Sequence, residues 1–178
     1  HSLKRIFQVL IVSALFQVFI AVLQFVRQAS LGLRILDESP LAPDLAGVAK
    51  FAAGGVKFIR AYGTFPHPSM LAAFSVLAIF GLVYLFASRE RISPLFIILN
   101  LLFLFGLFLT FSRVIMVAGL LAVGLYIFFV AEKKKTLFIF FGSCLLLLVL
   151  FWPLLSARFS TDLIGSQAVD LRVFYSRA

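Results

Sequence analysis

Residues 92–131 read ISPLFIILNLLFLFGLFLTFSRVIMVAGLLAVGLYIFFVA, an almost unbroken apolar run whose only charge is Arg113. About 22 residues separate Arg91 from Arg113, and about 20 separate Arg113 from Lys133. At ~1.5 Å per helical residue each stretch reaches roughly 30 Å, which is the thickness of a bilayer hydrocarbon core. The run therefore predicts two membrane-spanning helices that meet at Arg113, near one face of the membrane.

The composition of the whole chain agrees with a membrane protein. Of its 178 residues 63% are hydrophobic and 13% are charged, which is too apolar for a soluble domain of this size. The net charge of +9 comes from short basic clusters between apolar runs, an orientation signal rather than a nucleic-acid surface. The single cysteine, Cys144, excludes an internal disulfide and offers no zinc-binding spacing.

Five apolar runs are long enough for single crossings, and lipid requires them to be helices because backbone polar groups must be satisfied internally. They are Ile6–Val26, Met70–Phe86, Leu95–Phe111, Val114–Val130 and Leu137–Leu155. We therefore expect an all-α fold, a polytopic membrane helix bundle with about five transmembrane helices. Residues 1–178 are expected to form a single integral membrane domain and to be a fragment of a longer chain.

Short basic segments orient the predicted bundle, because such connections stay on the cytoplasmic side. They are Lys4-Arg5, residues 89–91 and residues 132–135. Residues 27–69 then form a long extracytoplasmic loop and residues 156–178 an extracytoplasmic tail. The turn at Ser112-Arg113 also lies on the outer face.

Two amphipathic helices are predicted on that outer face. In the long loop, Asp44 would cap a short helix running to Ala53, with apolar residues on one side and Lys50 on the other. The tail after Gly165 shows a similar pattern. Trp152, beside Pro153, would anchor the outer end of the fifth span at the membrane interface.

The most specific motif is residues 60–72, which read RAYGTFPHPSMLA. Gly63 allows close backbone approach, and Pro68 is well placed at a helix start. One interpretation is a rigid cap that seats the following helix, with Arg60 merely reaching toward water. The other makes Arg60 part of a phosphate-binding surface.

The second motif is LTFSR, residues 109–113. It ends in Arg113, the arginine predicted to lie near one face of the membrane. An arginine at this depth without a nearby acid is a functional-site candidate. In the predicted topology Arg60, Arg113 and Arg172 share the outer face. Guanidinium groups match phosphate geometry and stabilise the charge that develops on a diphosphate leaving group.

Together, these two motifs resemble the O-antigen ligase and polymerase superfamily, membrane glycosyltransferases that use undecaprenyl-diphosphate-linked glycans. In that family a Gly-x-Phe-x-(His/Asn)-Pro-Asn-like motif opens a transmembrane helix, and a Ser-Arg pair follows about two spans later. The segment 171–178 also looks like the family's Arg-containing outer helix. The chain departs from the pattern at Ser69, where Asn is common. Family members are about twice as long, and a later outer loop carries a catalytic His.

The resemblance implies transfer or polymerisation of glycan from a polyprenyl-diphosphate donor at the outer face of the bacterial cytoplasmic membrane. The implied partners are the lipid-linked donor, a lipid or glycan acceptor and membrane lipids, without metal, cofactor or nucleic acid. Arg113 and Arg60 would be catalytic. Arg172, His67, Gly63 and Ser112 would bind substrate.

Two alternatives stay open at the level of sequence. His67 titrates in the range of a general base, although its flanking prolines favour a positioning role. The chain could also be a transporter or flippase subunit for an anionic lipid-linked substrate. Transporters usually show polar or broken helices at the bilayer midplane, and here only Asn100 is central, which favours the enzyme.

Overall fold

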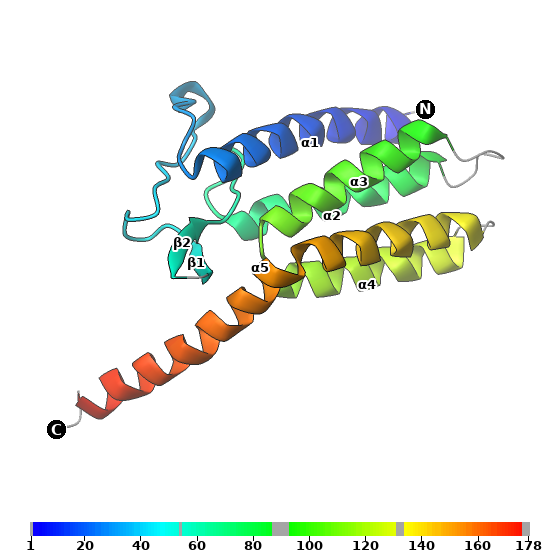
Figure 1. Ribbon diagram of the computed structural model, residues 1–178. Helices are drawn as coiled ribbons and strands as arrows, with labels where there is room; N and C mark the ends of the chain where they lie inside the picture. Colours follow the sequence, from blue (N-terminus) through cyan, green and yellow to red (C-terminus); the bar gives the residue numbers. More distant parts are fainter. Residues whose placement is uncertain (1, 54, 87–92, 131–133, 176–178) are drawn as a thin grey trace.

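The computed structural model of the chain describes residues 2–53, 55–86, 93–130 and 134–175 (Figure 1). Its helical elements are α1 (Ser2–Arg27), the 3-10 turn η1 (Arg34–Leu36), α2 (Pro68–Phe86), α3 (Pro94–Leu109), α4 (Arg113–Val130) and α5 (Lys134–Tyr175). Two short strands, β1 (Lys50–Ala53) and β2 (Val56–Ile59), lie between η1 and α2. The described chain is thus predominantly helical, as predicted, with one small sheet added.

The helices lie side by side, and α3 is central among them (Figure 1). It packs against α1, α2 and α5, while α4 packs against α2 and α5. The strands, η1 and the α3–α4 turn lie at one end of the bundle, and the N-terminus lies at the other (Figure 1). All segments that carry the candidate site residues 60–69 and 112–113 are therefore at the same end.

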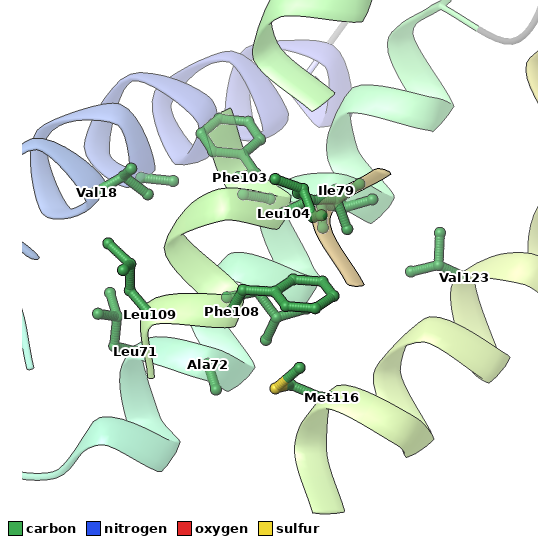
Figure 2. Close-up of a cluster of buried hydrophobic side chains, with 14 of the residues drawn as sticks. Val18, Leu71, Ala72, Ile79, Phe103, Leu104, Phe108, Leu109, Met116 and Val123 are labelled. Carbon is green, nitrogen blue, oxygen red and sulfur yellow. The ribbon is translucent and has the colours of Figure 1, made fainter. Parts of the chain in front are cut away.

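The interior is a continuous apolar core to which α1, α2, α3 and α4 all contribute (Figure 2). Small residues bring the helices close together. A Cβ added at Gly106 of α3 would lie 2.6 Å from Val18 Cγ2 of α1, and one at Gly119 of α4 would lie 2.5 Å from Val76 Cγ2 of α2. Such close backbone approach through small residues is typical of helix pairs in membranes.

Among the described residues, three helices are long and apolar enough, by length and composition, to cross a membrane. They are Ser2–Arg27, Pro68–Phe86 and the Lys135–Ser156 part of α5. The other two predicted spans form the shorter apolar helices α3 and α4. That these two also cross the bilayer stays a prediction.

The predicted amphipathic helix from Asp44 to Ala53 is wrong. Its last residues form β1, which pairs antiparallel with β2 in the register Lys50↔Ile59 to Ala53↔Val56. Gly55 (φ +79°) supplies the left-handed conformation that the turn requires. Phe51 is buried on β1, and its ring centroid lies 4.4 Å from that of Phe111 in the α3–α4 turn. This contact favours the strand over a helix.

The part of α5 that is long and apolar enough to cross a membrane, Lys135–Ser156, agrees with the predicted span Leu137–Leu155, but the helix itself continues to Tyr175. Pro153 lies inside the helix, and its fixed φ is compatible with helical geometry even though it removes one backbone hydrogen bond. The residues of the expected tail are thus helical but continuous with the span, and in Figure 1 they extend beyond the bundle. The basic segments 89–91 and 132–133 used for orientation lie outside the described residues.

Candidate functional site

The α3–α4 turn is the tight connection that the sequence predicted. Thr110 ends α3, and its Oγ1 donates to the Leu107 carbonyl (2.6 Å) and accepts from the Ser112 N–H (3.3 Å). Phe111 takes a left-handed conformation (φ 47°), which reverses the chain within three residues. As a result, Arg113 is the first residue of α4 and its side chain is half-buried.

The segment before α2 is hydrogen-bonded to this turn. Arg60 Nε donates to the Thr110 carbonyl (2.6 Å), and the Ala61 N–H donates to the Leu109 carbonyl (3.0 Å). Arg60 is only 8% exposed. Arg60 therefore contacts the turn after which Arg113 begins α4, and it contributes to holding the backbone that carries Arg113.

The first turns of α2 and α4 also meet at this place. Ser112 Oγ, just before α4, lies 3.2 Å from Ser69 Oγ in the first turn of α2. Each helix N-terminus carries a partial positive charge and backbone N–H groups without helical partners. Two helix N-termini and two hydroxyls thus lie together at one end of the bundle, where α4 begins with Arg113, and helix N-termini of this kind are suited to an anion.

His67 lies directly before Pro68 and caps α2. Its Nδ1 accepts the N–H of Ser69 (3.2 Å) and lies 3.1 Å from Ser69 Oγ. His67 thus caps α2 through Nδ1 while its side chain stays exposed, a placement that suits the positioning role that the flanking prolines favour.

The backbone at Gly63 lies close to a neighbouring helix, α1, and the sequence predicted such a close approach at this glycine. Its φ is +64°, and an added Cβ would lie 2.6 Å from Gln17 Oε1 of α1. Gln17 also pairs with Thr64 through both its amide atoms (2.8 and 2.9 Å). The turn at Gly63 therefore packs tightly against α1.

Gln24 of α1 makes most of the contacts that hold this turn. It is 0% exposed, accepts the Gly63 N–H (2.8 Å) and donates to the Gly63 carbonyl and to Glu38 Oε1 (both 2.8 Å). Gln28, directly after the end of α1, accepts the Ile59 N–H (2.7 Å). These glutamines were not predicted as structural residues, although Gln17 and Gln24, seven residues apart on one face of an apolar helix, are a usable signal.

Glu38 extends this network into the long loop. Its carboxylate accepts the N–H groups of Leu31 and Leu33 (both 2.7 Å) besides the amide of Gln24. Burial alone raises the pKa of Glu38, but the hydrogen bonds from Leu31, Gln24 and Leu33 outweigh it, so the pKa lies below its ordinary value. The loop is thus held by an ionised carboxylate.

The remaining predicted residues are not brought into this site by the described part of the chain. Arg172 lies on the distal part of α5, and its side chain lies outside what the structure describes. Asn100 is fully buried in α3, and neither of its amide atoms has a hydrogen-bond partner within the described residues. Across those same residues, no group of three or more His, Cys, Asp or Glu side chains is placed to hold a metal ion.

Comparison of the chain with protein-family models, with curated proteins and with solved structures gives no match. The likeness to the O-antigen ligase and polymerase superfamily thus rests on the motifs alone.

Proposed function

We propose that this chain forms the donor-binding part of a membrane glycosyltransferase of the O-antigen ligase and polymerase type. Its donor would be a glycan on a polyprenyl diphosphate, bound at the end of the bundle that carries Arg113. The apolar helices would span the cytoplasmic membrane, with this end facing the periplasm. Acceptor binding and the catalytic base would then lie elsewhere in the protein.

One observation carries the proposal, the convergence of Arg60, Arg113, Ser69 and Ser112 where α2 and α4 begin. The Arg60 bond to Thr110 and the 3.2 Å separation of the two serine hydroxyls fix this arrangement. A diphosphate carries charge that guanidinium groups, hydroxyls and helix N-termini all stabilise. Its polyprenyl chain would remain beside the apolar helices, so both ends of the ligand find a suitable surface.

The chemistry that this site supports is stabilisation of the leaving group. When the bond between sugar and diphosphate breaks, negative charge grows on the diphosphate, and cationic donors already in position lower the barrier. Arg113 would make this contact. Arg60 would position the α3–α4 turn, and His67 would help to position the diphosphate or the glycan.

The transporter alternative predicts a polar path through the middle of the bundle. Helices α2, α3 and α4 instead run without a break, and the buried polar group Asn100 is enclosed on all sides. Discontinuous helices are typical of transporter sites at the midplane. The enzyme is therefore the function that we propose.

The test uses the chain reconstituted in lipid nanodiscs and measures binding of radiolabelled polyprenyl diphosphate. We expect Arg113→Lys to weaken binding about 10-fold, because a point charge replaces a planar fork, and Arg113→Ala to weaken it further. In the full-length protein the same variants should lose most glycan transfer.

Arg5, an exposed arginine near the opposite end of α1, provides the matched control. Arg5→Lys and Arg5→Ala should leave donor binding unchanged. Equal effects at the two positions would reduce the role of Arg113 to a general charge effect. Undiminished binding by Arg113→Ala would overturn the proposed site.

A further inference from the structure

We propose that the loop tip formed by η1 inserts into the lipid headgroup region beside α1, as a second membrane contact independent of the spanning helices. The tip consists of Arg34, Ile35 and Leu36. Ile35 is 100% exposed, and Leu36 is also exposed. The occupant of this apolar tip would be the phospholipid of the adjacent leaflet.

The tip is held in a fixed shape, so the exposure of Ile35 is built into the fold. The Ser30 N–H donates to the Leu41 carbonyl (3.1 Å) and closes the base of the loop, where Leu41 is buried. Glu38 fixes the interior by accepting the N–H groups of Leu31 and Leu33. These hydrogen bonds satisfy backbone groups on both sides of the tip, which lowers the cost of placing Ile35 in the headgroup region.

The position of the tip favours lipid over any other occupant. In Figure 1 the first part of the loop between α1 and β1, which holds η1, rises above the end of α1 on the side away from the other helices, and the rest of the loop runs down to the strands at the end of the bundle. The exposed apolar face of α1, which includes Phe19 and Val26, is by necessity also directed away from the core. Ile35 would thus continue the surface that α1 presents to lipid.

The charges near the tip fit a phospholipid interface. Arg34 adjoins Ile35 in η1 and Arg27 ends α1, and one exposed carboxylate, Asp37, follows η1 directly. Arginine at the boundary can contact lipid phosphates while neighbouring apolar side chains reach the upper acyl chains. The inference rests on insertion of α1 in a bilayer, which is part of the proposed function, and not on glycan transfer.

The test measures tryptophan quenching in nanodiscs made with brominated phospholipids. All variants carry Trp152→Phe, so that the introduced tryptophan is the sole one. Ile35→Trp should lose emission most strongly with bromine near the headgroup end of the acyl chain and less with bromine near its terminus. Leu36→Trp serves as a second tip variant, and Phe19→Trp, within α1, reports on insertion of that helix.

The outcomes separate the tip from the span. Quenching of both Phe19→Trp and the tip variants supports the proposal. If bromolipid quenches Phe19→Trp while only an aqueous quencher such as iodide quenches the tip variants, the proposed tip insertion is wrong. The assignment of α1 as a membrane span then stands. Tip variants that neither quencher reaches would indicate burial against a second copy of the chain, which also overturns the proposal. Absence of lipid quenching at Phe19→Trp would contradict insertion of α1 itself.

Discussion

Replacing Gln24 by Leu should separate the segment before α2 from α1. Leu keeps the volume of the buried side chain, so the change removes hydrogen bonds without opening a large cavity. Four hydrogen bonds are lost. Three are of 2.8 Å, to the Gly63 N–H, the Gly63 carbonyl and Glu38, and the fourth is a longer bond of 3.3 Å from the Tyr62 N–H. At about 0.5–1.5 kcal/mol for each bond, the variant should unfold with a free energy lower by about 2–6 kcal/mol.

The loss is expected near the upper end of that range for two reasons. Gly63 is buried, so its peptide groups cannot exchange the lost partner for water. The Glu38 bond involves a charged acceptor, and bonds to charged groups are stronger than neutral ones.

The assay is reversible unfolding by sodium dodecyl sulfate in mixed micelles, followed by circular dichroism. Gln8→Leu is the control, because Gln8 lies on the same helix but is exposed. We expect the free energy of unfolding of Gln8→Leu to stay within about 0.5 kcal/mol of that of the unsubstituted chain. If Gln24→Leu unfolds at the same detergent fraction as Gln8→Leu, the proposed function of the glutamine network in holding Gly63 is wrong.

Two further changes test buried polar groups. Asn100→Leu should stabilise the chain by about 1–3 kcal/mol in the same unfolding assay, because Leu removes a buried amide without partners among the described residues; a loss of stability would instead reveal a partner for Asn100. The pKa of Glu38 is lowered in the folded chain, so its stabilisation of the loop is complete above the ordinary pKa and is lost as pH falls through the folded value. Amide-exchange protection of Leu31 and Leu33 should therefore decrease in acid, and Glu38→Gln should remove this dependence.

Much of the helical fold was predictable because length and hydropathy determine where a chain of this kind forms helices. The turn at Ser112-Arg113 and the start of α2 at Pro68 followed from the only charge in a long apolar run and from the proline preference for a first helical turn. Both features are local in sequence. A single sequence carries such signals strongly.

The wrong prediction concerns a segment whose structure depends on a contact with a distant residue. Asp44 to Ala53 has a pattern compatible with a helix, but the aromatic contact of Phe51 with Phe111, sixty positions later, favours a strand. The continuity of α5 beyond Leu155 was also not predicted, because a proline followed by polar residues is typical of a helix boundary. A proline is tolerated where the rest of the helix supplies the backbone bonds.

Of the candidate site, the sequence predicted the arginines, Gly63 and the serine before α4, but not the residues that hold them together. The bond from Arg60 to Thr110 spans fifty positions, and Gln24 reaches Gly63 across thirty-nine. Such pairs have no local signature. The spacing of the glutamines indicates that one face of α1 is polar, but it does not say which segment that face binds.

The close contacts of Gly106 with Val18 and of Gly119 with Val76 constrain how this protein can change in evolution. A larger side chain at either glycine overlaps the valine opposite unless that valine becomes smaller. The two members of each pair should therefore vary together among descendants of this chain, with their combined volume kept nearly constant. Substitution at either glycine alone would push neighbouring helices apart. A larger residue at the glycine is therefore expected only together with a smaller residue in place of the valine, or after that valine has changed.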